Sequence, residues 1–128
     1  MRIVAEEGNG WDLGLAGSPE AVKARIDRMN EYCDKISRRA DSIKLSHSGM
    51  VVLSSTNDHA TDLVKAKARD LNTTIGFFME RHLVGSPGQI ASRMNEYVDM
   101  GIGHFTLYFD RDLRNLDRFA SEVIRQVG

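Results

Sequence analysis

The stretch from residue 43 to residue 54 has the hydropathy pattern of a strand inside a parallel sheet. Ile43, Leu45 and His47 alternate with polar residues up to Gly49, and residues 50–53 are all apolar. A continuous apolar run of this length is typical of a parallel strand that is buried on both faces. Because parallel strands need long, usually helical connections, the segment predicts an α/β fold.

Amphipathic helices with clear start signals precede and follow that strand. The only two prolines, Pro19 and Pro87, each come directly after a Gly-Ser pair. Serine is a favourable N-cap, and proline is well tolerated at the first helical position. Apolar residues at intervals of three and four then predict one helix over about 20–38 and a second that ends near Gly101.

These two helices share the sequence Arg-Met-Asn-Glu-Tyr, at 28–32 and again at 93–97. The match is offset by three residues relative to the two caps. An ancient duplication and a chance similarity between two amphipathic helices both account for it.

The rest of the chain continues the alternation of helices and strands. Apolar spacing predicts a helix over about 60–71, capped by Thr56 or Asn57, and a C-terminal helix over 116–127, while residues 72–84 are compatible with a short helix. Residues 103–109 alternate with a period of two, which predicts another strand. We therefore expect a single domain over 1–128, with parallel strands joined by right-handed crossovers.

Composition argues against several classes of protein. Seventeen Lys and Arg against 18 Asp and Glu, mixed along the chain, do not form the basic face of a nucleic-acid-binding protein. The longest apolar run and the polar N-terminus predict neither a membrane segment nor a secretion signal. One cysteine, Cys33, which we expect to be buried and inert, fits a cytoplasmic protein. The four histidines lack metal-ligand spacing, so no metal site is expected.

Four stretches carry a family resemblance. They are Glu-Glu-Gly-Asn-Gly-Trp at 6–11, Leu-Val-Gly-Ser-Pro at 83–87, the passage 95–105, and the segment 116–124. In this order they resemble the C-terminal part of the luciferase-like monooxygenase family, flavin- and deazaflavin-dependent oxidoreductases built on a (β/α)8 barrel. Two positions depart from the family pattern, since Asn9 stands in place of an Asp and Arg125 in place of a common Pro.

The resemblance implies a partial (β/α)8 barrel of about three βα units, with strands near 9–13, 43–54 and 103–109. A complete barrel takes about 250 residues, so the first five units would be absent. With them would go the glycine-rich loop that meets the cofactor phosphate and most of the flavin pocket. The implied cofactor is FMN or a deazaflavin (coenzyme F-420), with the substrate a small organic molecule. This chain alone would form one wall of the pocket and bind the cofactor weakly or not at all.

A three-strand part of a barrel leaves two strand edges and the inward-facing side chains uncovered. We therefore expect association, either as a homo-oligomer or with a separately encoded N-terminal barrel half, and no nucleic-acid or membrane partner. A non-catalytic homo-oligomeric α/β module derived from such a barrel is the alternative function. Truncation of a longer enzyme is a third possibility.

In such barrels the active-site groups lie on loops at the C-terminal ends of the strands. This rule and the resemblance select Asn9, Trp11, Asp12 and Asp110 as candidate cofactor-binding residues. Trp11 could wall a pocket or be a core or interface aromatic. Asp12 and Asp110 could bond a substrate hydroxyl or ring nitrogen, or cap turns. No catalytic residue is identified.

Further groups have two possible roles each. Residues 54–58 precede a helix and could receive a phosphate or form an N-cap, and residues 110–112 follow the third strand. His104 could be a general base or a hydrogen-bonded structural residue. Arg38 and Arg39 are expected to be a solvated helix end.

Overall fold

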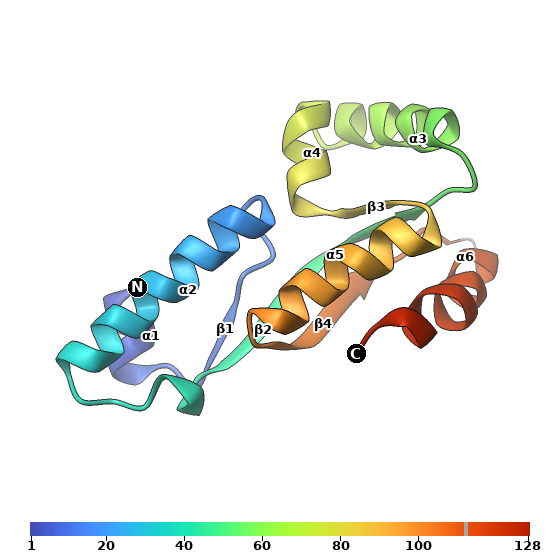
Figure 1. Cartoon of the computed structure of the whole chain (residues 1–128). Helices are drawn as coiled ribbons and strands as arrows, with labels where there is room; N and C mark the ends of the chain where they lie inside the picture. The colour runs from blue at the N-terminus through green and yellow to red at the C-terminus, as the bar shows by residue number, and fades with distance from the viewer. Residues whose placement is uncertain (112) are drawn as a thin grey trace.

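A ten-residue strand, β2 (Lys44–Leu53), runs through the middle of the molecule, and each of the other strands pairs with it (Figure 1). The computed structural model describes residues 1–111 and 113–128. The elements are, in order, α1 (Arg2–Glu7), β1 (Gly10–Asp12), α2 (Pro19–Lys35), η1 (Ala40–Ser42), β2, α3 (Asn57–Asp70), α4 (Ile75–Arg81), β3 (Leu83–Gly85), α5 (Pro87–Asp99), β4 (Ile102–Tyr108), α6 (Leu113–Arg118), η2 (Phe119–Val123) and η3 (Ile124–Gln126).

All pairings in the sheet are parallel. β1 pairs with residues 44–46 of β2, β4 with residues 45–50, and β3 with residues 51–53. The sheet is open, because its strands do not close into a ring. The predicted α/β class, the parallel strands and the three predicted strand positions are thereby confirmed. The three-residue β3 was not predicted, since so short a strand shows no periodicity.

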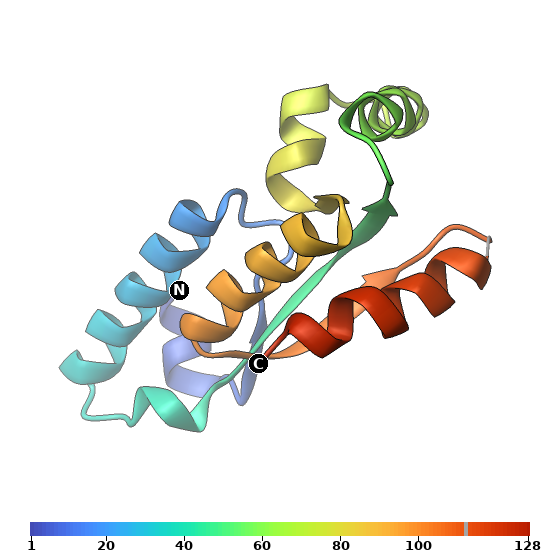
Figure 2. The same cartoon turned by 45° about the vertical axis from the view of Figure 1, so that its right-hand side comes forward.

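Helices cover most of one face of the sheet and a smaller part of the other face. The main core lies between β2 and the layer formed by α2, α5 and the C-terminal segment, and Figure 1 shows α5 lying across β2 and β4. Figure 2 shows α3 and α4 apart from this layer, beside the carboxyl end of β2. There they enclose a second cluster, formed by Val52, Val64, Ala68 and Phe78.

The predicted helix starts are confirmed. The Ser18 hydroxyl accepts a hydrogen bond from the Ala21 amide, and Thr56, not Asn57, caps α3. Ser86 forms a complete capping box with Gln89. After α5, Gly101 has a φ of 94°, a left-handed conformation that glycine adopts without strain and that stops the helix as predicted.

The helix predicted over 20–38 ends early, and Arg38 is half-buried instead of lying on a solvated helix end. α2 stops at Lys35, and Ser37 has a positive φ of 56°. This turn directs the Arg38 guanidinium to α1, where it donates to the carbonyl oxygens of Ala5, at 2.9 Å, and Gly8. The carbonyls at the end of α1 need such donors, which explains the departure. Arg39 is exposed and pairs with Asp41.

Two other predictions need correction, because tertiary packing departs from the local pattern. The helix predicted over 116–127 is divided into α6, a π-helical turn and a 3-10 turn. This winding buries Phe119 and Val123 in the core and leaves Ile124 exposed. Of the apolar run 50–53, predicted to be buried on both faces, residues 51–53 are buried and Met50 is half-buried.

We predict that Gly14→Ala lowers the free energy of unfolding by about 2 kcal/mol, a typical cost of overpacking. An added Cβ at Gly14 would overlap the backbone carbonyl and side chain of Ser48. Gly88→Ala is the matched control, since a Cβ there meets nothing within 4 Å and alanine favours the helix by about 1 kcal/mol. Urea titration measures both, and equal effects of the two substitutions would contradict this account.

Candidate functional site

The carboxyl ends of β2 and β4 border a cleft of about 310 Å³. We call it the carboxyl-end cleft. It lies where barrel enzymes place their reacting groups, because the loops after parallel strands gather at that edge. Its lining residues are Leu53, Ser54, Ser55, His59, Leu63, Asp110, Asn115 and Arg118.

The loop after β2 is held by its own hydroxyl groups. Ser54 is buried, and its Oγ donates to the Thr56 carbonyl at 2.7 Å and accepts from the Thr56 amide at 3.3 Å. The Thr56 side chain in turn accepts from the His59 amide at 3.2 Å. These bonds confirm the N-cap interpretation of this segment. They also direct Ser55 and His59 to the surface of the cleft.

The charged groups of the cleft are already paired. Asp110 accepts from Lys67 of α3 at 2.5 Å, which ties the exit of β4 to that helix. Arg118 contacts Glu122 one turn further along, with its Nε 3.2 Å from the carboxylate. The cleft therefore offers hydroxyl, imidazole and amide groups more readily than a free charge. Asp112, also a candidate from the sequence, lies outside the described residues.

Asp12 lies in a separate polar cluster on the uncovered face of the sheet. Its carboxylate accepts from the Ser48 hydroxyl at 2.7 Å, the Ser46 hydroxyl at 2.9 Å and the Gly14 amide at 3.0 Å. Partial burial raises the pKa of Asp12, but these hydrogen bonds and nearby His47 outweigh burial and hold it below its ordinary value. Asp12 therefore joins the loop after β1 to β2, as a turn-capping residue does.

The other two candidates at the first strand lie apart from the carboxyl-end cleft. Trp11 is half-buried and packs against the core clusters on the helix-covered face. Asn9 is exposed, and its carbonyl accepts from the Lys44 amide at 3.0 Å. β1 is so short that its last residue pairs with Ser46, well before the end of β2. Of the four candidates, only Asp110 reaches the cleft.

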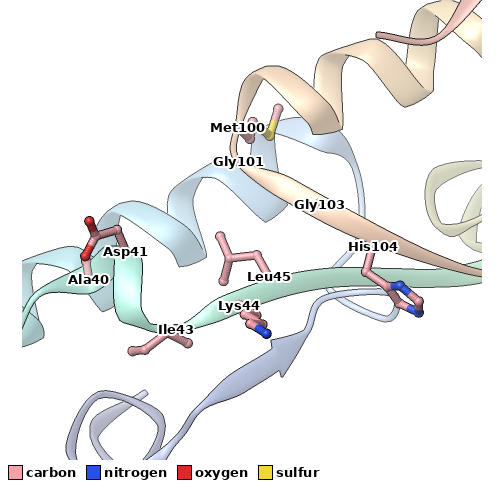
Figure 3. A pocket seen from close by; sticks show the side chains of 9 residues that line it. All are labelled: Ala40, Asp41, Ile43, Lys44, Leu45, Met100, Gly101, Gly103 and His104. Atoms are coloured by element: carbon pink, nitrogen blue, oxygen red, sulfur yellow. The ribbon is translucent and has the colours of Figure 1, made fainter.

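A larger cleft, of about 630 Å³, lies at the opposite end of the strands. Figure 3 shows its lining side chains around the starts of β2 and β4, among them Lys44, Leu45 and His104. We call it the amino-end cleft. His104 is exposed there, at the start of β4. Barrel enzymes keep their chemistry at the carboxyl ends, so we take the smaller cleft as the candidate site.

Within residues 1–111 and 113–128, no three His, Cys, Asp or Glu side chains gather as they would around a metal ion. None of the helices in this part of the chain is long and apolar enough to span a bilayer.

Sequence reasoning missed three polar residues of the cleft, His59, Asn115 and Arg118. His59 lies one residue beyond the segment chosen after β2, in the first turn of α3. Asn115 and Arg118 belong to α6, which packs back towards the strand ends. The rule that active-site groups follow strand ends selects only the loops. Extending each selected segment by one helical turn would have included His59 and Asn115.

Comparison with solved structures decides the fold. A secondary alcohol dehydrogenase dependent on coenzyme F-420, in complex with an F-420–acetone adduct, aligns with 99% of this chain at a TM-score of 0.74 and 12% identity. A long-chain alkane monooxygenase aligns with 97% at 0.66 and 17% identity. The FMN-bound oxygenating constituent of a Pseudomonas putida Baeyer–Villiger monooxygenase aligns with 100% at 0.56 and 15% identity. The first two of these neighbours are members of the luciferase-like monooxygenase family.

The fold is that of part of a luciferase-like barrel. The chain spans 45%, 37% and 45% of the length of these three structures, respectively. No protein-family model and no curated protein matches the sequence. At such low identities the comparison confirms the fold expected from the four sequence stretches.

We predict that Asp12→Ala lowers the free energy of unfolding by about 1 kcal/mol at pH 7, because three hydrogen-bond donors lose their acceptor. The effect is modest because the site is partly exposed and water screens the charge. The folded-state pKa of Asp12 is depressed, so its contribution is present above pH 3.8 and is lost as the pH falls below that value. Urea titrations of wild type and variant should therefore converge in acid. Glu31→Ala, on an exposed helix position, should show neither effect.

Proposed function

We propose that the chain contributes one wall of the cofactor and substrate pocket of a luciferase-like oxidoreductase that uses FMN or coenzyme F-420. The supporting observation is the alignment of nearly the whole chain with F-420- and FMN-dependent enzymes. The carboxyl-end cleft supplies the position at which such a barrel would bind its ligands. The substrate is a small organic molecule. The single buried Cys33 fits a cytoplasmic enzyme.

The cleft fits part of a flavin cofactor. Ser55, His59 and Asn115 present groups that can hydrogen-bond the polar side chain of such a molecule. The apolar part of the lining is limited to Leu53 and Leu63, which is too little to enclose a three-ring system. Its volume is also at the low end of the range for ligand pockets. The flavin would supply hydride transfer or oxygen activation when bound, while these residues would orient it.

The remaining walls come from a partner in this proposal. Within the described sheet β4 pairs only with β2, so its other edge is unpaired, and His104, Thr106 and Tyr108 on its outward face are exposed. Such a strand, without a charged lysine or a proline, is open to pairing. The partner is an N-terminal barrel half or a second copy of this chain. A homo-oligomer without cofactor is the second candidate, favoured by the same uncovered strand.

We expect the isolated chain to show no saturable binding of FMN or F-420 below about 100 μM in fluorescence titrations, since one wall buries too little of the ligand. Adding a designed N-terminal half that pairs with β1 and β4 should restore binding. In that assembly His59→Ala should weaken binding about tenfold, the effect of one lost hydrogen bond. Lys44→Ala, at the amino-end cleft, should leave it unchanged.

Two results would contradict the proposal. Tight flavin binding by the isolated chain would show that its cleft is complete. A folded, completed barrel that binds neither FMN nor F-420 would favour the oligomeric module without a cofactor.

We also expect the chain alone to self-associate, with a mass above 14.3 kDa in size-exclusion chromatography with light scattering. Thr106→Lys places a charge on the uncovered strand and should shift the population to monomer. Ser92→Lys, on an exposed position of α5, is the matched control and should not. A monomer at every concentration tested would be the contrary result.

A further inference from the structure

A fully buried histidine lies in the middle of β2, on the face covered by α5. His47 has no exposed surface, and its ring stacks on Tyr97 of α5, with centroids 4.3 Å apart and an angle of 29° between the planes. The ring of Phe105 from β4 lies 6.2 Å away. The imidazole is therefore part of the contact between the strand and its covering helix.

The surroundings of His47 tolerate only its neutral form. Within the described residues, neither ring nitrogen has a hydrogen-bond partner, and the hydroxyl of the buried Tyr97 has none either. An imidazolium here would be a buried cation without an acceptor, which costs far more than the neutral ring. Burial accordingly lowers the pKa of His47 from its ordinary 6.5 to about 4.

A second histidine requires neutrality for a different reason. His82 lies between α4 and β3, and its Nδ1 accepts a hydrogen bond from the Met50 amide of β2 at 3.1 Å. Its ring also packs against Phe78, with centroids 4.3 Å apart. A protonated imidazole has no acceptor nitrogen, so protonation would break this bond and set two N–H groups against each other.

The two imidazoles meet at Gly49. A Cβ added to this glycine would lie 3.3 Å from His47 Cε1 and 3.6 Å from His82 Nδ1. Gly49 therefore makes room for both rings beside the strand. Two imidazolium charges at such short range would repel each other strongly in a poorly solvated environment.

The charged groups around the pair oppose protonation on balance. Asp12 on β1 favours a charged His47, whereas Arg93 on α5 and His82 disfavour it. Burial and the neighbouring Arg81, which pairs with Glu80, lower the pKa of His82. Asp12 is the one acid among these neighbours, and its carboxylate is already engaged by two serines.

We propose that His47 and His82 form an acid-sensitive latch, which holds α5 and the α4–β3 connection on β2 while both rings are neutral and releases them on protonation. His47 controls the contact with α5, and His82 controls the hydrogen bond to Met50. The latch lies on the helix side of the strand that leads to the carboxyl-end cleft. It is independent of the proposed cofactor.

The direction of the pH dependence follows from the depressed pKa of His47. The folded state is favoured fully above pH 6.5, loses stability as the pH falls from 6.5 to about 4, and loses no more below that. Between pH 7.5 and pH 5, His47 alone should raise the equilibrium constant for unfolding about 25-fold. His82 adds to this effect.

The test is a series of urea titrations of the 128-residue chain between pH 7.5 and pH 5. His47→Phe keeps an aromatic ring against Tyr97, and His82→Asn keeps an acceptor for the Met50 amide. The double variant should lose most of the 25-fold change. His59→Asn and His104→Asn, both at exposed positions, should retain it. The hydrogen-exchange protection factor of the Met50 amide, taken relative to the intrinsic exchange rate at each pH, should fall in acid in the wild type before global unfolding.

If a variant does not fold, NMR titration of the histidine Cε1 protons in the wild type tests whether His47 stays neutral in the folded chain. We expect His47 to stay neutral down to the acid transition. The latch would be overturned if His47 titrated near pH 6.5 in the folded chain while the protection factor of the Met50 amide did not change with pH. A double variant with the pH profile of the wild type would also overturn it.

Discussion

The backbone pairing of β2 is the interaction on which the rest of the structure depends. This single strand exchanges hydrogen bonds with β1 near its start, with β4 through its middle and with β3 at its end. The crossover helices α2 and α5 return the chain to this strand each time, and they share its covered face. Loss of the β2 pairings would leave the remaining strands without any partner in the described sheet, because β1, β3 and β4 pair only with β2.

The two faces of β2 differ, and this difference places the possible sites. On one face, apolar side chains and His47 pack under α5, so that face is a core. On the other, Ser46 and Ser48 bind Asp12, and only the last residues are covered by α3 and α4. In a closed barrel this second face would point into the lumen. The polar groups around Asp12 are therefore on the side that would face the lumen, whereas the carboxyl-end cleft lies at the strand ends and is lined in part by Leu53 of the covered face.

Much of the fold could be predicted from the sequence because it is locally determined. Ser18, Ser86 and Thr56 cap helices as expected, since a cap depends on a few neighbouring residues. The candidate site was less predictable. Asp110 reaches the cleft, but Asp12 and Trp11 do not, because the register of β1 on β2 is a long-range property. His47 was seen only as an alternating strand residue, and its burial depends on contact with a helix fifty residues later.

The sequence by itself determined the alternation of helices and strands apart from β3, the helix caps and the resemblance to a luciferase-like barrel. Those features follow from hydropathy period and from short phrases that act over a few residues. Only the tertiary structure decided that α2 ends at Lys35, which lets Arg38 bind α1, and that the C-terminal helix changes its winding. It also decided which polar residues contact one another. These outcomes depend on carbonyls, core space and strand register supplied by distant parts of the chain, which compete with local preference and prevail over it.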